Sequence, residues 1–318
     1  MLVVERGEPG HEASHAAAGM LVGSTLEGPK ALHPLAAASA EMYPEFVHEL
    51  QDESGVHVDL RDQGTLVFGH EGCGVKLPAP LLELEPSLAL SDHPAEFVKE
   101  RSVDPRALGA AALKAAKHRE ADISSGTEVT SLLIAEGKVA GVICAKTAYH
   151  AAIVVNCAGA WAGLLGPHRF PIRPVKGQML AVVGQPVLRH VIRTPDVYLV
   201  PRSDGRILIG ATVEEAGFDK RTVPETIHRL HQAALGAVPA LAEARVHEAW
   251  AGLRPGTPDD LPILGPTETP GYFVATGHFR DGILLAPVTA LLMAQVISGE
   301  TPRHDLSAFS PGRFQMSP

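Results

Sequence analysis

Two arginines stand in segments rich in glycine and proline, where a fixed guanidinium group can hold a carboxylate. Arg254 lies within residues 250–257 (WAGLRPGT), and Arg280 lies within residues 277–282 (GHFRDG). The glycines and prolines predict turns, and a positioned guanidinium binds a carboxylate through two parallel hydrogen bonds. Tyr198 adds a hydroxyl in an alternating apolar strand. The alternative is that Arg254 and Arg280 are ordinary surface arginines and Tyr198 is a core residue, so a site in which they hold a carboxylate is a hypothesis at this point.

A second group of residues has the spacing of a zinc site. Residues 11–15 read His-Glu-Ala-Ser-His, the HExxH pattern that puts two imidazoles on one face of a helix with a glutamate between them. Pro9 and Gly10 come immediately before, so His11 stands at best at the start of a helix. A zinc hydrolase and a loop that contains two histidines both stay open.

The remaining reactive residues give weaker signals. Cys157 has no neighbouring base in the sequence, which favours a small buried residue over a nucleophile. No G-x-S-x-G segment occurs, so a serine hydrolase has no support. Glu5 ends an early apolar run, the position at which dinucleotide-binding folds hold an adenosine ribose. The G-x-G-x-x-G loop that usually accompanies such a glutamate is not found in the sequence, and a solvated glutamate is the alternative.

Composition limits the class of protein. A chain of 318 residues predicts two domains, and a net charge of −9 argues against nucleic-acid and anionic-membrane partners. The three cysteines are far apart, which predicts a reducing, cytoplasmic location without disulfides. Residues 147–168 and 282–299 lack Asp, Glu, Lys and Arg, but glycine and proline interrupt both runs. We therefore expect buried elements there and no membrane span or secretory signal.

The predicted elements alternate between helix and strand at both ends of the chain. Helices are expected at residues 34–54, 104–116, 224–235 and 283–297, with a helical turn at 81–84. A buried strand is expected at residues 152–155, and the middle of the chain is rich in strands of antiparallel character. This order predicts an α/β domain interrupted by an α+β domain. The other expected strands are residues 2–5, 65–68, 129–133, 139–146, 170–183, 198–201, 206–213 and 272–276.

Four segments occur together in one order: residues 5–21, 155–163, 250–257 and 277–287. Together they resemble the FAD-dependent D-amino-acid oxidase superfamily, most closely the glycine oxidases of bacterial thiamine-thiazole biosynthesis. The resemblance covers essentially the whole chain. It implies a Rossmann-like FAD-binding domain, truncated at its N-terminus, that is interrupted by an antiparallel-sheet substrate domain. The FAD-binding domain is expected at residues 1–58, 104–165 and 252–318, and the substrate domain at 59–103 and 166–251.

The resemblance assigns roles to individual residues. Arg254 matches a substrate-carboxylate arginine, Tyr198 the tyrosine beside it, and Arg280 a second arginine on the substrate side. The resemblance places the HExxH match within a flavin-binding segment, so it implies no metal. His15 lies one residue too early for the motif through which some related dehydrogenases attach flavin, so we expect noncovalent FAD. The residues implied to contact FAD are Glu5, Arg6, Ala13, Ser14, Ala18, Gly19, Met20, Val129, His278, Phe279, Arg280, Asp281, Gly282, Ile283 and Leu284.

The activity implied by the resemblance is oxidation of a small amino acid or secondary amine such as glycine or sarcosine. Hydride transfer to flavin would give an imine, and dioxygen as acceptor would give hydrogen peroxide. A quinone-linked amino-acid dehydrogenase and a noncatalytic, flavin-free relative are the alternatives. The exact amine, the electron acceptor and the oligomeric state, a homo-oligomer included, stay open.

One departure from the family pattern concerns the start of the chain. Family members begin with a strand, a Gly-rich turn and a helix before the strand that we expect at residues 2–5. A late start codon, a true truncation and another role for the chain are the competing explanations. Because the first strand of such a sheet is central, we expect its neighbours to lack a partner on one edge and FAD binding to be weak.

Overall fold

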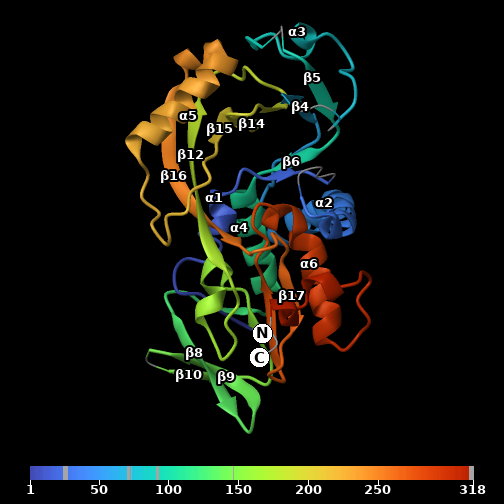
Figure 1. The fold of residues 1–318 in the computed structure, drawn as a ribbon, viewed down its shortest axis with the longest axis vertical. Helices are drawn as coiled ribbons and strands as arrows, with labels where there is room; N and C mark the ends of the chain where they lie inside the picture. The colour runs from blue at the N-terminus through green and yellow to red at the C-terminus, as the bar shows by residue number, and fades with distance from the viewer. Residues whose placement is uncertain (24–27, 70–71, 73, 91–92, 146, 315–318) are drawn as a thin grey trace.

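The computed structural model describes residues 1–23, 28–69, 72, 74–90, 93–145 and 147–314. Figure 1 shows a part built on one large sheet, which we call the sheet lobe, above a part that contains three long helices, which we call the helical lobe. Within the described ranges, no helix combines the length and the apolar character needed to cross a membrane.

The sheet lobe contains a seven-stranded sheet with the order β16-β12-β15-β14-β13-β4-β5. Its pairs are antiparallel except for β13 and β4, which are parallel. The helix α5 (Pro224–Ala237) covers one face, where Leu230 and Ala234 pack with Leu180 and Ile209. In sheet order the strands are Arg245–Gly256, Arg173–Val183, Arg206–Gly210, Tyr198–Pro201, Val191–Arg193, Thr65–Phe68 and Ala95–Val98, and a short helix, α3, spans Leu81–Leu84.

The long pairing of β12 with β16 determines which side chains face the helical lobe. Side chains alternate between the two faces of a strand, and the register places Val175 beside Arg254 and Met179 beside Trp250. Met179 packs with Ala18, whereas α5 covers the opposite face. Arg254 therefore lies on the face that meets the N-terminal part of the chain.

The helical lobe is organised by α2 (His33–Ser54), α4 (Pro105–His118) and α6 (Gly282–Ile297), which share one apolar core. The Asp104 carboxylate accepts the N–H groups of Arg106 and Ala107 at 2.9 and 3.3 Å and so caps α4. α2 ends at Gly55, whose φ of 66° is the left-handed conformation typical of a helix end. The helices expected from the sequence are all present, with ends that differ by a few residues.

Four small sheets complete the described structure. β1 (Leu2–Val4) pairs in parallel with β7 (Asp122–Ser124), and β11 (Val154–Asn156) pairs in parallel with β18 (Tyr272–Thr276), which also pairs with β17 (Ile263–Pro266). Among the described strands, β1 and β11 each have a partner on one edge only. The remaining elements are β8 (Val129–Ala135), β9 (Lys138–Cys144), β10 (Ala148–His150), β2 (Met20–Leu21), β6 (Arg101–Val103), β3 (Leu60–Arg61), α1 (Ala13–Ala16) and the 3-10 helices η1 (Lys30–Leu32), η2 (Gly159–Leu164), η3 (Pro239–Glu243), η4 (Ser307–Phe309) and η5 (Pro311–Phe314).

Two predictions about strands and turns are wrong. The strand expected to be buried at residues 152–155 is open to solvent, with Ile153 47% and Val155 36% exposed, because β11 has one neighbouring strand in the described sheet. Residues 250–255, expected as a turn, belong to β16. Proline is tolerated there because β16 is an edge strand, where Pro255 need not donate to a further strand. The strand also runs through the expected domain boundary between residues 251 and 252, and the division into domains stays a prediction.

Candidate active site

Arg254 lies across the surface of β12 because a glycine leaves room for it. A Cβ at Gly177 would collide with the Arg254 guanidinium, so a larger residue cannot stand there without displacing this side chain. Arg254 Nη1 donates to the carbonyl oxygens of Thr212 at 3.1 Å and of Lys176 at 3.4 Å. The hydrogen bonds of the guanidinium to the backbone use Nη1 alone, which leaves other donors for a carboxylate.

Tyr198 reaches the same face of the sheet in the same way. It pairs with Gly210 in the sheet, and a Cβ at Gly210 would lie 2.8 Å from the Tyr198 hydroxyl oxygen. Burial raises the pKa of Tyr198, an effect that the neighbouring Arg254 and Arg280 charges oppose. Burial lowers the pKa of Arg254, which Tyr198 opposes, but a guanidinium stays charged at neutral pH. The site therefore presents a neutral phenol beside a cation.

The loop at residues 277–281 brings Arg280 to this pair. The Phe279 N–H donates to the Pro255 carbonyl oxygen at 3.1 Å, directly beside Arg254 in the chain. His278 Nε2 is 3.1 Å from the Thr289 hydroxyl on α6, and burial lowers the pKa of His278 to about 4, so the imidazole is neutral at pH 7. Arg280 is exposed, and its guanidinium lies 5.1 Å from the centre of the Phe279 ring. Arg254, Tyr198 and Arg280, three of the residues predicted from sequence, are thus brought together.

The N-terminus of α6 follows this loop and offers free backbone donors. Asp281 stands at the N-cap position but makes no side-chain capping hydrogen bond. In the described structure the N–H groups of Gly282, Ile283 and Leu284 accordingly have no capping partner. Unsatisfied N–H groups and the positive end of the helix dipole favour an anion or a developing negative charge.

The segment at residues 13–21 lies against both lobes and contains small residues where the backbone needs space. α1 is followed by an extended stretch and then by β2, which pairs with β6. Gly19 has a φ of 72°, and a Cβ there would collide with the Val103 carbonyl oxygen. On the sheet side, a Cβ at Gly252 would collide with Ala16.

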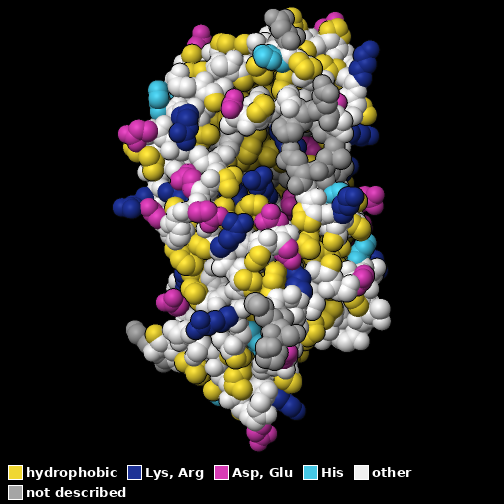
Figure 2. All heavy atoms as spheres, viewed as in Figure 1, with side chains coloured by type: hydrophobic (Ala, Val, Ile, Leu, Met, Phe, Trp, Pro, Cys, Tyr) yellow, Lys and Arg dark blue, Asp and Glu magenta, His cyan; other side chains and the backbone are white. Residues whose placement is uncertain are grey.

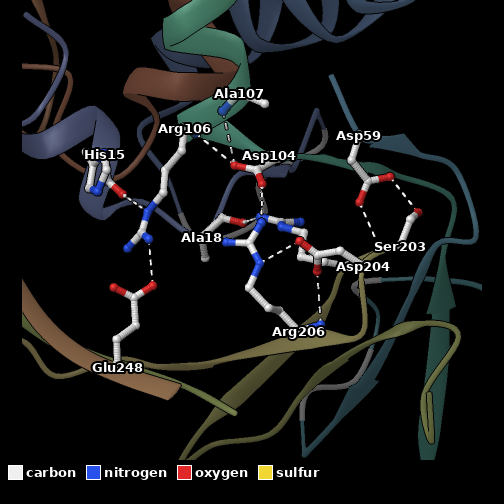
Figure 3. A network of polar contacts seen from close by, with 11 residues as sticks. His15, Ala18, Asp59, Asp104, Arg106, Ala107, Ser203, Asp204, Arg206 and Glu248 are labelled. Atoms are coloured by element: carbon white, nitrogen blue, oxygen red, sulfur yellow. Dashed lines mark hydrogen bonds and ion pairs between the residues drawn. The ribbon is translucent and has the colours of Figure 1, made fainter. Parts of the chain in front are cut away.

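Side chains from other elements hold the backbone of this segment in place. The Ala16 carbonyl accepts from Trp250 Nε1 at 3.1 Å, the His15 carbonyl from Arg106 Nε at 3.3 Å, and the Ala18 carbonyl from Arg202 Nη2 at 2.5 Å. Figure 3 shows Arg106 reaching from α4 toward both His15 and Glu248. Figure 2 shows acidic and basic side chains side by side across the middle of the molecule, in the view of Figure 1. The positions of Ala16 and Ala18 are thus fixed by residues far away in the sequence.

Arg202 is the least satisfied member of this polar network. It is buried, and its Nε and Nη1 atoms have no hydrogen-bond partner in the described structure. Burial lowers the pKa of Arg202 to about 10, while Asp104 and Asp59 oppose that shift. Burial would raise the pKa of Asp104, but Arg202 and Arg206 together with backbone N–H groups hold it below its ordinary value. Asp104 ionises readily here and balances the buried cation, and its 2.7 Å ion pair with Arg206 is drawn in Figure 3.

The remaining predicted positions lie near the ends of β1 and β8. Glu5 follows β1, and its carboxylate accepts the Gly7 N–H at 2.8 Å. The Arg6 guanidinium stacks 3.7 Å from the centre of the Trp161 ring and pairs with Glu12 at 3.3 Å. Val129 begins β8. The end of β1 is therefore tied to η2, the element that follows β11.

The histidines of the HExxH match are not arranged on one helix face. His11 lies before α1, stacks on His15 with ring centres 4.5 Å apart, and pairs with Glu8 at 3.3 Å. Glu12 instead binds Arg6 and Lys220. No group of three ligating side chains that could hold a metal ion occurs among the described residues.

Cys157 was expected to be buried, and its side chain is exposed. The surrounding protein nevertheless raises the pKa of its thiol to about 11. At such a pKa the thiol is protonated at neutral pH and is a poor nucleophile.

Comparison with known proteins now places this geometry in a family. The family model described as "FAD dependent oxidoreductase" (DAO) matches residues 1–296. The chain belongs to this family. Among solved structures, glycine oxidase from Geobacillus kaustophilus superimposes with a TM-score of 0.92 at 32% sequence identity, covering 99% of this chain and 92% of that one. The expected combination of α/β and α+β architecture and the resemblance to glycine oxidases are confirmed.

Two curated relatives show similar identity over most of this chain. "Hydrogen cyanide synthase subunit HcnC" from Pseudomonas aeruginosa is 35% identical over 318 residues, covering 91% of this chain and 76% of that protein. "Bifunctional protein ThiO/ThiG" from Trichormus variabilis is 35% identical over 326 residues, covering 95% of this chain and 50% of that protein. The chain is an FAD-dependent oxidoreductase, as expected from its sequence.

The described residues include groups of the kinds that suit FAD. The α6 N-terminus supplies uncapped N–H groups, Gly19 and Gly252 keep the segment at residues 13–21 close to both lobes, and Arg202 keeps two buried donors without partners. Such groups suit a planar, electron-accepting ring that becomes negatively charged.

Several residues that build the site were not found from the sequence. Gly177 and Gly210 make room for Arg254 and Tyr198, and Arg202 anchors Ala18. A glycine within a strand pattern is a usable signal for close approach, and both glycines lie in expected strands. Arg202 carried no such signal.

Proposed function

We propose that this protein binds FAD noncovalently and oxidises the CH–NH bond of a small amino acid or secondary amine, with glycine or sarcosine as the substrate class. The observation that carries the proposal is the pairing of a half-buried guanidinium, Arg254, with a neutral phenol, Tyr198, beside Arg280. Similarity to glycine oxidase supports the choice of substrate, and the family supplies the cofactor.

The residues of this chain bind and orient the substrate. Arg254 holds the substrate carboxylate through its free donors, and the Tyr198 hydroxyl donates to the same carboxylate. Tyr198 stays neutral because its pKa is raised, and His278 stays neutral because its pKa is lowered to about 4. The candidate substrate-binding groups therefore fix geometry and charge, and the amine must arrive in its neutral form.

Held by the segment at residues 13–21 and the start of α6, FAD would supply a two-electron acceptor for the hydride of the substrate α-carbon. Loss of a proton from the resulting iminium would give the imine, and dioxygen would be the oxidant that regenerates the cofactor and yields hydrogen peroxide. Addition of water to the imine would then give a 2-oxo acid, together with ammonia from glycine or methylamine from sarcosine. Orientation of the α-carbon by Arg254 and Tyr198 is the contribution of the protein, and near-attack positioning is worth several kcal/mol of barrier. A place in thiamine-thiazole synthesis is the finer expectation that the resemblance to glycine oxidases carries.

Anaerobic titration of the FAD-reconstituted protein with glycine or sarcosine tests the proposal. We expect the visible absorbance of oxidised flavin to fall, and readmitted air to restore it with one hydrogen peroxide per turnover. Bleaching without peroxide would instead identify a dehydrogenase that uses another acceptor. Absence of flavin binding with added FAD would contradict the proposal, and yellow colour that stays with acid-precipitated protein would contradict noncovalent attachment.

A further inference from the structure

Pro287 creates an unpaired carbonyl in the first turns of α6. Proline has no N–H, so the carbonyl oxygen four residues earlier, on Ile283, loses its helical partner. The Tyr43 hydroxyl of α2 donates to that carbonyl oxygen. Tyr43 is fully buried and burial raises the pKa of its phenol, so the hydroxyl is a permanent donor.

Ser39 acts one turn earlier on the same face of α2. Its hydroxyl donates to the Leu284 carbonyl oxygen at 2.6 Å and accepts the Val288 N–H at 3.3 Å. It therefore stands between two groups that would bond directly to each other in a regular helix. Residues four apart lie on one helix face, so Ser39 and Tyr43 together grip the proline-distorted turn. We call this pair of residues and its bonds to α6 the α2–α6 clamp.

At the second proline inside a helix, a different kind of group bonds to the carbonyl that the proline leaves without a helical partner. Pro44 leaves the Ala40 carbonyl of α2 without a helical partner, and Arg101 Nη1 donates to that oxygen at 3.3 Å. The charged side chain of Arg101 comes from the start of β6 and is partly exposed, whereas the clamp is buried between two helices. Only the clamp acts on the residues whose N–H groups stand uncapped at the start of α6.

We propose that Ser39 and Tyr43 are positioning residues for the cofactor: they fix the first turn of α6 so that the N–H groups of Gly282, Ile283 and Leu284 meet the flavin. The inference rests on the proposed function, because it takes this helix end as the part that faces FAD. Because a peptide group is planar, holding the Ile283 carbonyl fixes the Leu284 N–H, and holding the Leu284 carbonyl fixes the Leu285 N–H, which bonds to the Asp281 carbonyl oxygen and closes the first turn.

A double-mutant cycle between Tyr43→Phe and Pro287→Ala tests the clamp. Tyr43→Phe leaves a buried carbonyl unsatisfied, and we expect the Kd for FAD to rise about tenfold, equivalent to about 1.4 kcal/mol. The midpoint potential of the bound flavin should fall, because donors to its reduced form move away. In the Pro287→Ala background an amide N–H can bond to the Ile283 carbonyl, so Tyr43→Phe should change the Kd by less than twofold. An equal change in both backgrounds would contradict the clamp.

A matched pair of serine variants separates positioning from general stability. Ser54 lies at the other end of α2 and also bonds in both directions, to the Leu50 carbonyl and from the Val56 N–H. We expect Ser54→Ala and Ser39→Ala to lower the melting temperature of the apoprotein alike, and Ser39→Ala alone to weaken FAD binding and shift the potential. Wild-type protein that binds no FAD would overturn both proposals. Unchanged FAD affinity and potential in Tyr43→Phe and Ser39→Ala would overturn the clamp and leave the proposed function standing.

Discussion

The two walls of the candidate site are built in different ways. The sheet wall offers side chains, Arg254 on β16 and Tyr198 on β14, two strands of one continuous sheet that are separated by β12 and β15. The cofactor wall offers backbone, namely the segment at residues 13–21 and the first turn of α6. Side chains such as Arg202 and Tyr43 hold that backbone from outside.

This difference predicts how each wall responds to substitution. On the sheet wall one side chain carries one function, so its removal changes substrate binding and leaves the sheet intact. On the cofactor wall the groups that face the ligand are N–H and C=O groups, which substitution cannot delete. Their positions depend on glycines and on distant anchors, so substitutions there change FAD binding and stability together.

The largest expected effect is on the sheet wall. Arg254→Met removes the charge that holds the carboxylate, and we expect kcat/KM for glycine to fall about 10³-fold, or about 4 kcal/mol. Steady-state peroxide formation measures it, with Arg245→Met, an exposed position on the same strand, as control. A fall of less than tenfold, with the control unchanged, would remove Arg254 from substrate binding.

The next effect tests the cofactor wall. Gly19→Ala combines a φ of 72° with a collision against the Val103 carbonyl. We expect the variant to lose about 3 kcal/mol of folding stability and also to lose bound FAD. Gly10 is the matched control, because its φ of 81° is similar but a Cβ there meets no atom within 4 Å. Gly10→Ala should cost only the strain of the left-handed conformation, about 1–2 kcal/mol. Equal losses in urea unfolding would show that the contact with Val103 does not matter.

A smaller effect connects a glycine to a side-chain function. Gly177→Ala places a Cβ where the Arg254 guanidinium lies, and displacement of that group should raise KM for glycine about tenfold, or about 1.4 kcal/mol. The control is Gly184→Ala, where a Cβ would lie 3.0 Å from the Ala244 Cβ, away from Arg254. If both variants keep the wild-type KM, the glycine does not make room for a working guanidinium.

The smallest effect concerns the charge at the start of α6. Burial raises the pKa of Asp281 to about 6, with Arg280 opposing the shift. Between pH 4 and 6 the folded carboxyl holds a proton that the unfolded chain has lost, and above pH 6 the folded protein must carry the buried charge. Asp281→Asn should therefore be more stable than wild type by about 1 kcal/mol at pH 7.5 and equal to it below pH 4. Unfolding of the apoprotein across this range measures it, and a difference that does not vary with pH would contradict the assignment.

The same contrast explains how much the sequence could predict. Arg254 and Arg280 stand in motifs whose residue types signal their chemistry, and the Asp104 cap with Pro105 marked the start of α4 directly. The strand that contains Arg254 was missed, because glycine and proline indicate a turn unless the edge position and the close approach of Ala16 are known. Local sequence shows residue type, and it does not show which backbone a residue will approach.

The anchors of the cofactor wall could not be predicted for a related reason. Arg202 bonds to Ala18 across 184 residues of sequence, and Tyr43 bonds to Ile283 across 240. Each lies in an ordinary turn or helix, and its role exists only when segments far apart in the sequence are packed together. The orphan carbonyl that Pro287 creates is the one sequence signal, since a proline within a helix demands a substitute donor from somewhere.

The most direct test of the central claim compares glycine with glycinamide, which has nearly the same size but no carboxylate charge, in wild type and in Arg254→Met. The measurement is the rate of anaerobic bleaching of bound FAD at low substrate concentration. We expect wild type to prefer glycine by about 10²–10³-fold and the variant to reduce this preference to within about threefold, because the desolvated carboxylate loses its partner. The same preference in both proteins would contradict the claim that Arg254 holds the substrate carboxylate.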